Sequence, residues 1–567
     1  MTQLRELRAP ERDAALPAPV ARRLGLPGAA SARTYVGAAT DWLAARPARA
    51  WCSSPEDEVV YQAFLGPFLG FAGETGTLCS LVCHLPFLVE DLGATTVLLL
   101  PLLQRGAARA KGTTGSPFAV ADHRRLDPAL NGFDADVEVV WAALVAACRR
   151  IGVRLGMILP LATIAIDAPR IAAAPELVHW WQAGPEETLA GEAAAGAPWQ
   201  VEATPAPAAL ERFVAAPEPD ALRAVDGLFV AADAHGRPVT VANAYPDPVA
   251  ADAATYTWRD VAAIRFTRDV APAPHRGPVR GGENPAASAF IRAVLAHRVS
   301  ADGGALLADV SSALPATVLA GCVPPYPETM LVAEQLWSYR ERAPFEFVTG
   351  PLVPCVAAHT RAPAVLARSL AHHLSLLAES DDARWFFAGA ANHDSVPCPE
   401  RWTRALLTLF CLLPRSVPFV YSGTEMASEA PTNLEFGDLG GQPHPPESEL
   451  LLFSQSAVAV DVAALTRFTA FWRDLLALRA ALGTAGGAPA TITGVAQDGL
   501  VVSARIAGVL VAVNCSPSAS ACVPVEETAA VLGTAPLTRR GGTVELEPVS
   551  TLVAAPAGLS RLGAFFT

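Results

Sequence analysis

The chain alternates between segments with apolar residues at helical spacing and short, continuous apolar runs. Residues 75–93 and 134–152 carry apolar residues at helical spacing and end in glycine, a common stop signal for helices. An apolar run typical of a buried strand follows each of them, at residues 95–103 and 153–162. Similar runs come later, at residues 304–310, 328–336, 344–352, 384–390 and 416–423. This alternation of helices and buried strands predicts a parallel sheet, either open or closed into a barrel.

Three stretches depart from this alternation. Residues 1–54 are rich in proline, alanine and arginine and are interpreted as an N-terminal extension. Residues 170–290 lose the regular pattern over a length too great for a plain connection, so we expect an inserted subdomain or a lid there. Residues 485–567 alternate apolar and polar positions with period two, which predicts a C-terminal antiparallel β-sandwich domain. The parallel-sheet domain would then consist of residues 55–169 and 291–484.

Composition argues against several classes of partner. The 567 residues carry a formal net charge of −13, which argues against a general nucleic-acid binder, because phosphate contacts need clustered Lys and Arg. The longest apolar run, ATTVLLLPLL, contains a proline and is only about half of the ~20 residues that a membrane-spanning helix needs. The first residues lack the apolar segment of a secretory signal, so we expect a cytoplasmic protein with no membrane partner. A neutral small molecule or a sugar suits this composition better.

Three of the expected strands end on a carboxylate. Asp309 closes one apolar run, Glu334 closes the next, and Asp394 follows a third within the sequence Asn392-His393-Asp394. Each acid on its own is compatible with a helix N-cap or a surface ion pair. Three acids at equivalent places in one alternation favour a site, because strand C-terminal ends meet at one edge of a parallel barrel. Two carboxylates facing each other are what retaining glycoside hydrolysis requires.

The order of these segments resembles the α-amylase superfamily, glycoside hydrolase family 13. Residues 76–101 are similar to its helix and second strand, SPFAVADHRRLDP (116–128) to its Tyr-Asp-Val-x-Asp-Tyr segment, and VPFVYSGTEMA (417–427) to its strand 8 signature. The resemblance runs from about residue 60 to the C-terminus. It implies a (β/α)8 TIM barrel with a subdomain inserted after strand 3 and a C-terminal antiparallel β-domain.

The resemblance also implies roles for individual residues. Asp309 would be the nucleophile, Glu334 the general acid/base and Asp394 the transition-state stabiliser of a retaining double displacement on α-glucans or maltooligosaccharides. His393 and Asn392 would contact the sugar hydroxyls. Phe118 stands where the family has a tyrosine that stacks on the sugar.

Several positions depart from the family pattern. The arginine that usually lies two residues before the nucleophile is Leu307, and the aspartate that follows the stacking tyrosine is Ala119. The strand 3 motif, Asp-x-x-x-Asn-His, falls on PLATIA, so that Pro160, Ile164 and Ala165 replace its three polar residues. The asparagine of this motif often binds calcium in the family. Because Ile164 stands in its place here, no metal is expected, and no other cofactor is implied.

The residues therefore leave alternatives open. An active hydrolase or transglycosidase is favoured by the three retained carboxylates. A maltosyltransferase-like enzyme that elongates glucan is suggested by a faint similarity at residues 167–181. A catalytically impaired member that binds α-glucan or a protein partner is favoured by the apolar replacements, and an unrelated barrel enzyme is a further possibility.

Overall fold

The computed structural model describes most of the chain outside the expected insertion. The described residues are 2–52, 54–178, 180–182, 230–232, 238–241, 258, 260–266, 284–309, 314, 328–336, 345–379, 384–433, 445–486, 492–506, 508–526 and 529–555. Most of the range 170–290, predicted to form an inserted subdomain, lies outside these residues. The domain boundaries expected from the sequence stay predictions.

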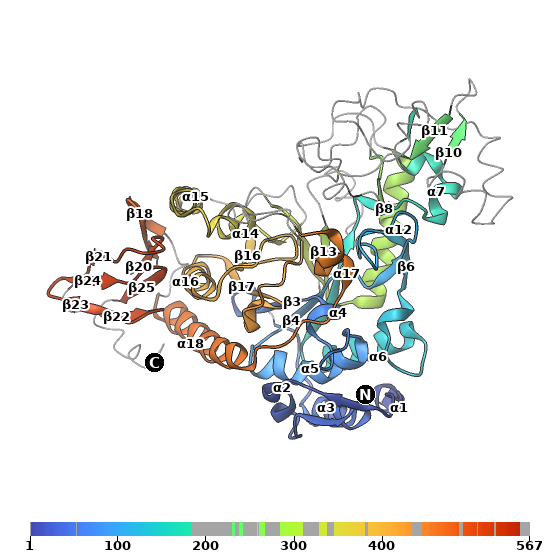
Figure 1. Ribbon diagram of the computed structural model, residues 1–567, viewed down its shortest axis with the longest axis horizontal. Coiled ribbons are helices and arrows are strands. Elements are labelled where there is room, and N and C mark those ends of the chain that lie inside the picture. The colour runs from blue at the N-terminus through green and yellow to red at the C-terminus, as the bar shows by residue number, and fades with distance from the viewer. Residues whose placement is uncertain are drawn as a thin grey trace.

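Eight parallel strands close into a barrel in the middle of the molecule (Figure 1). They are β3 (Val60–Ala63), β4 (Thr96–Leu99), β7 (Arg154–Pro160), β13 (Ala305–Asp309), β14 (Met330–Ala333), β15 (Phe347–Val348), β16 (Trp385–Ala388) and β17 (Ser416–Tyr421). Each pairs with the strand that precedes it in sequence order, and β17 returns to pair with β3. The predicted (β/α)8 barrel is therefore confirmed.

Helices surround the strands and follow the sequence pattern. The described helices are α1 (Thr2–Glu6), α2 (Ala18–Arg23), α3 (Ala32–Ala45), α4 (Leu65–Phe68), α5 (Leu78–Glu90), α6 (Val137–Arg150), α7 (Pro169–Ala173), α12 (Pro285–Asp302), α14 (Leu352–Cys355), α15 (Pro363–Ala378), α16 (Glu400–Phe410), α17 (Leu451–Ser454) and α18 (Val462–Gly486). Helix α6 begins where the Asp136 side chain accepts a hydrogen bond from the Glu138 amide. Helix α12 ends at Gly303, whose φ of 61° is left-handed and suits glycine. Local capping residues thus define the ends of elements that the apolar periodicity indicates.

Alternate residues of the barrel strands form two separate cores. Ala305 and Leu307 of β13 belong to the cluster inside the barrel, whereas Leu306 and Ala308 pack into the larger cluster that the helices share. Because strand side chains alternate between faces, Asp309 continues the inward series of Ala305 and Leu307. Met330 and Val332 of β14 also belong to the cluster inside the barrel. The next inward-facing position of that series is Glu334, at the same end of the barrel.

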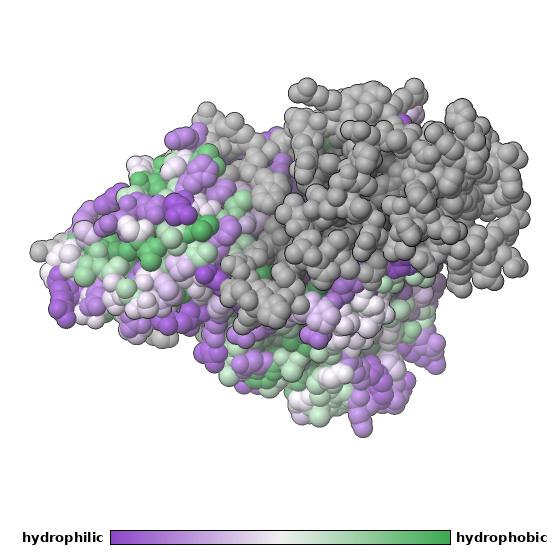
Figure 2. Space-filling view, turned by 45° about the horizontal axis from the view of Figure 1, so that its top comes forward, coloured by the Kyte–Doolittle hydropathy of each residue, from purple (hydrophilic) through white to green (hydrophobic). Residues whose placement is uncertain are grey.

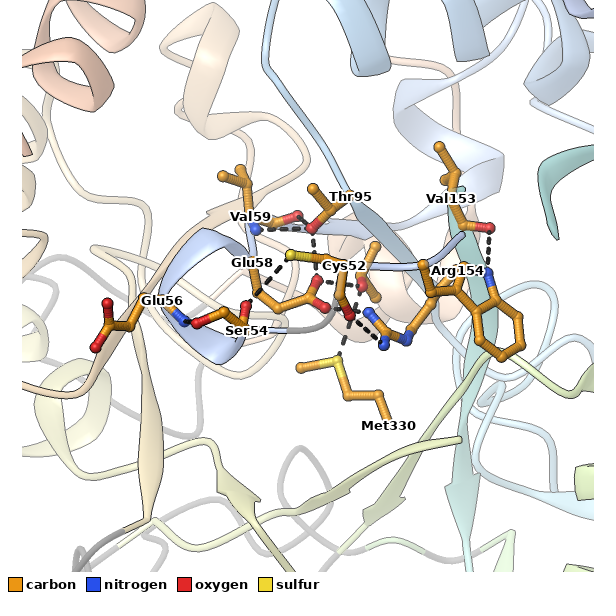
Figure 3. A network of polar contacts seen from close by, with 11 residues as sticks. Cys52, Ser54, Glu56, Glu58, Val59, Thr95, Val153, Arg154 and Met330 are labelled. Carbon is orange, nitrogen blue, oxygen red and sulfur yellow. Dashed lines mark hydrogen bonds and ion pairs between the residues drawn. The ribbon is translucent and has the colours of Figure 1, made fainter. Parts of the chain in front are cut away.

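A buried polar network lies at the opposite, N-terminal end of the strands (Figure 3). The Arg154 guanidinium forms an ion pair with Glu58, which is 3% exposed, and also donates to the Cys52 carbonyl. The hydroxyls of Thr95 and Thr96 donate to the other Glu58 oxygen, at 2.5 and 3.1 Å. These contacts connect the chain before β3 with the starts of β4 and β7.

The N-terminal helices pack on one side of the barrel. Helices α2 and α3 contact α5, and Arg23 forms ion pairs with Glu90 at 2.7 Å and with Asp91. Two short strands, β1 (Asp13–Ala15) and β2 (Ala29–Ser31), form an antiparallel pair in the same segment. Residues 2–45 are therefore folded against the barrel.

Several short strands lie outside the barrel. Strands β5 (Leu103–Arg105) and β6 (Val120–Leu126) pair antiparallel after β4. Strand β8 (Thr163–Ala165) follows β7 and pairs with β12 (Val261–Ala263). The remaining described strands of the expected insertion form one sheet: β9 (Trp180–Gln182), β10 (Val230–Ala232) and β11 (Pro238–Val241). Strand β12 thus returns the chain from the insertion to the side of the barrel.

The C-terminal segment forms two antiparallel sheets at one end of the molecule (Figure 1). Their strands are β18 (Ile492–Asp498), β19 (Val501–Ile506), β20 (Val509–Asn514), β21 (Ala521–Pro524), β22 (Ala530–Gly533), β23 (Thr538–Arg540), β24 (Thr543–Leu546) and β25 (Ser550–Ala555). A small apolar cluster joins the two sheets, with Ala512 and Leu552 from one and Val523, Val544 and Leu546 from the other. The expected C-terminal antiparallel β-domain is confirmed.

On the face shown in Figure 2, hydrophilic and hydrophobic residues are interspersed over the described part of the chain. Among the described residues, no helix combines the length and the apolar character that crossing a bilayer requires.

Candidate active site

Two of the predicted carboxylates lie side by side at the C-terminal ends of neighbouring strands. Asp309 is the last residue of β13 and is 6% exposed, and Glu334 directly follows β14 and is 3% exposed. The Glu334 amide donates to the Ala308 carbonyl at 3.0 Å, which holds the two strand ends together. One oxygen of each carboxylate and one ring nitrogen of His393 lie within 4.8 Å of one another.

The turn after β16 places the other predicted polar residues beside this pair. The Asn392 side chain accepts a hydrogen bond from the Asp394 amide at 3.2 Å, and the Asn392 amide donates to the Ser395 hydroxyl at 3.0 Å. This tight turn directs the buried His393 and Asp394 together, with His393 Nε2 3.2 Å from the Asp394 carboxylate. The remaining Asp394 oxygen accepts from the Asn433 side chain at 3.0 Å, so the loop after β17 fixes this carboxylate.

An aromatic stack covers the imidazole. The Phe118 ring is stacked on His393, with 5.1 Å between ring centroids and 19° between planes. Trp258 meets Phe118 edge-on, and Phe453 meets Trp258 in the same way. All the residues that the sequence predicts for the site, from Phe118 to Asp394, are therefore brought together.

A buried lysine holds the outer end of this stack. Lys111, the only lysine in the chain, is 2% exposed, and its ammonium lies 4.3 Å from the Phe453 ring centroid and 5.0 Å from that of Trp258. It also forms an ion pair with Glu447 at 3.6 Å. The backbone amides of Lys111 and Ser116 both donate to the Asp260 carboxylate, at 3.3 and 3.0 Å. Burial raises the pKa of Asp260, partly offset by these amides and the lysine charge.

A further buried carboxylate lies in the loop after β17. Glu425 accepts hydrogen bonds from the Tyr61 hydroxyl at 2.7 Å and from the Gly423 amide at 2.9 Å. Burial raises its pKa from 4.5 to about 7, against the opposing effect of these donors. The burial also raises the pKa of Tyr61. The pair joins β3 to the loop after β17.

A small cavity lies next to Glu334 and His393. Among the described residues it is lined on the polar side by Glu334, Asn392, His393 and Gln62, and on the apolar side by Leu307 and others of the barrel interior. It leaves about 20 Å³ for the centres of water molecules, enough for one water.

Comparisons with known proteins place this geometry in context. No protein-family model matches the chain, and no curated protein matches it. Solved structures do match. An α-amylase from Malbranchea cinnamomea has a TM-score of 0.55 at 13% identity, covering 91% of this chain and 100% of that one. An α-amylase from Lactobacillus plantarum has a TM-score of 0.54 at 14% identity, covering 88% of this chain and 99% of that one.

The chain has the α-amylase fold. A variant of MutB, a trehalulose synthase, in complex with glucose has a TM-score of 0.57 at 12% identity, covering 89% and 99%.

Within this α-amylase fold, the apolar replacements noted in the sequence are core residues. Leu307 lies on the inner face of β13 at 2% exposure, and Ala119 is buried in the larger cluster that the helices share. Pro160 ends β7 in register with Asp309, and its carbonyl accepts a hydrogen bond from His123 Nε2 at 2.9 Å. Ala165 is fully buried in β8. Apolar side chains that pack in the core thus stand at positions where the family resemblance predicts polar groups.

Sequence reasoning missed several residues that build this site of the α-amylase fold. Asn433, Trp258, Asp260 and Glu447 lie outside the apolar runs and helical patterns of the sequence, and no periodicity marks them. Lys111 carried a signal, since it is the only lysine in a chain whose other basic residues are arginines. Its place beside the site depends on three loops meeting in space.

Proposed function

We propose that the protein is a glycoside hydrolase or transglycosidase of α-amylase type that acts on α-glucans or maltooligosaccharides with retention of configuration. The observation that carries the proposal is the closeness of the Asp309 and Glu334 carboxylates, with one oxygen of each within 4.8 Å. Retaining enzymes hold their two carboxyl groups about 5–5.5 Å apart, whereas inverting enzymes need roughly 6.5–9.5 Å to admit a water. A structural neighbour from Geobacillus thermoleovorans, with a TM-score of 0.51, was solved in complex with acarbose, which supports a carbohydrate substrate.

In the proposed mechanism, Glu334 gives its proton to the glycosidic oxygen while an Asp309 oxygen attacks the anomeric carbon. The bond to the leaving group breaks, and a covalent glycosyl ester on Asp309 forms. Glu334, now ionised, removes a proton from water or from an acceptor sugar hydroxyl, whose oxygen then displaces Asp309. Water as acceptor gives hydrolysis, and a sugar hydroxyl gives transfer.

The turn after β16 would bind the sugar during these steps. Asp394 and His393 would accept and donate hydrogen bonds to ring hydroxyls, and Asn433 holds the Asp394 carboxylate in place. Hydrogen bonds to a charged group are worth about 1.5–3 kcal/mol each, so this orientation matters to the rate.

A second candidate is a catalytically impaired protein that binds α-glucan without cleaving it. The buried, apolar Leu307 two residues before Asp309 favours this candidate, as does the small volume of the described cavity. In this case the three carboxylates would bind sugar hydroxyls, and no covalent intermediate would form.

The two candidates are separated by turnover with maltooligosaccharides, with and without maltose 1-phosphate as donor. For the enzyme, Asp309→Asn should reduce turnover by roughly 10³-fold or more, because the covalent step loses its nucleophile. Glu425→Gln serves as the matched control, since Glu425 is another buried carboxylate at a strand end that takes no part in the proposed steps. Product formation that needs the phosphate donor would identify a maltosyltransferase.

Binding separates the outcomes further. Equal turnover by wild type and Asp309→Asn would refute the proposed mechanism. Calorimetric binding of maltotetraose or acarbose without any turnover would establish the second candidate.

A further inference from the structure

We infer that the Asp309, Glu334 and His393 cluster binds a divalent cation of the zinc class. The three residues supply two carboxylate oxygens and one imidazole nitrogen, all buried and all within 4.8 Å of one another. Carboxylate and imidazole are ordinary zinc ligands, and three protein ligands with one open position is a common arrangement at zinc sites. This inference concerns binding of a cation and does not depend on the proposed glycosidase activity.

The imidazole provides a second observation that points to a ligand. His393 is 2% exposed, and among the described residues its Nδ1 has no hydrogen-bond partner. Leaving a buried polar atom unpaired is costly, and His393 is the histidine of this kind that also lies beside two carboxylates. Nε2 lies 3.2 Å from the Asp394 carboxylate, which leaves Nδ1 as the ring nitrogen without a hydrogen-bond partner among the described residues.

The surroundings of the imidazole match those of a metal-bound histidine. A ligating histidine usually donates its other ring N–H to a carboxylate, which fixes its tautomer and orientation. Asp394 takes that role here, and Asn433 in turn holds Asp394 through a hydrogen bond of 3.0 Å. With Nε2 protonated, Nδ1 carries the lone pair that a cation requires.

Distances and space favour a small cation. Three ligand atoms with edges of at most 4.8 Å leave a centre no more than about 2.8 Å from each, so shifts of about 0.7 Å give the 2.0–2.2 Å of zinc bonds. The adjoining cavity leaves about 20 Å³, which suits one bound water. Calcium needs six to eight oxygen ligands and magnesium keeps several waters, so neither suits this set.

The consequence is an antagonism between cation and sugar. A cation bridging Asp309 and Glu334 occupies the oxygens that the proposed mechanism uses for attack and proton transfer. If the protein is a glycosidase, zinc should therefore inhibit it competitively, with inhibition relieved by a chelator.

The test uses tag-free, chelator-treated protein without sugar, so that its outcome is independent of any enzyme activity. Titration with ZnCl2 in a calorimeter should give one tight site in the wild type. His393→Ala and Glu334→Gln should each weaken it at least about 10²-fold, and Asp394→Asn, which loses the orienting partner, by about 10–100-fold. His84→Gln is the matched control, because His84 is also buried with an unpaired nitrogen but lies outside the cluster. It should leave binding unchanged.

Cobalt distinguishes this site from the cysteines. The chain has ten cysteines, and soft thiolates bind zinc readily. Co²⁺ bound at the cluster should show ligand-field bands without a thiolate charge-transfer band, and His393→Ala should abolish those bands. Absence of zinc binding in the folded wild type, or equal binding by wild type, His393→Ala and Asp394→Asn, would overturn the inference.

Discussion

Glu425 should make the stability of this protein fall as pH rises through the weakly acidic range. Its carboxyl group is fully buried, and burial raises its pKa from 4.5 to about 7. Between these two pH values the folded chain therefore keeps a proton that the unfolded chain has released, and stability declines with pH wherever the folded state binds more protons. The shift corresponds to about 3 kcal/mol, which is present below pH 4.5 and lost by about pH 7.

Glu425→Gln isolates this effect because glutamine resembles the protonated acid. Its amide N–H₂ can donate to the Tyr61 hydroxyl, while its carbonyl accepts from the Gly423 amide as the carboxyl does. The free energy of unfolding of the wild type relative to the variant should therefore drop by about 3 kcal/mol between pH 4.5 and 7, and stay constant above it.

Urea unfolding at a series of pH values measures this difference. Glu400→Gln provides the control, since Glu400 forms an exposed ion pair with Arg467 at 2.9 Å. Its effect should stay below about 1 kcal/mol at every pH. Parallel stability curves for wild type and Glu425→Gln would refute the reasoning, because they would mean that Glu425 titrates alike in both states.

Two predictions concern buried ion pairs. Lys111→Met removes the cation that pairs with Glu447 and lies over two aromatic rings, so it should lower the urea midpoint by the equivalent of about 3–5 kcal/mol, and adding Glu447→Gln should recover part of the loss. A double variant no more stable than Lys111→Met would contradict this account. Arg154→Met should lower the free energy of unfolding by a similar amount, because the buried Glu58 loses its cation. Arg149→Met, which removes an exposed pair with Glu328, should lower it by less than about 1 kcal/mol in the same assay. Equal losses for the two arginine variants would show that burial does not set the value of these pairs.

The sequence by itself determined the barrel and the main residues of the candidate site. Apolar runs and helical periodicity are local properties, and a strand or helix needs only its own residues to show them. The position of Asp309 and Glu334 at strand ends followed from the same pattern, since alternation places Ala305, Leu307 and Asp309 on one face. The structure confirms the fold class, and the roles of these residues stay predictions.

Only the tertiary structure decided what surrounds those carboxylates. The stack of Phe118 on His393, the contact of Asn433 with Asp394 and the position of Lys111 join segments that lie tens to hundreds of residues apart. No local pattern encodes such contacts, because they arise when the barrel closes and its loops meet. The closeness of one imidazole nitrogen to two carboxylates is of this kind, since His393, Asp309 and Glu334 follow three different strands.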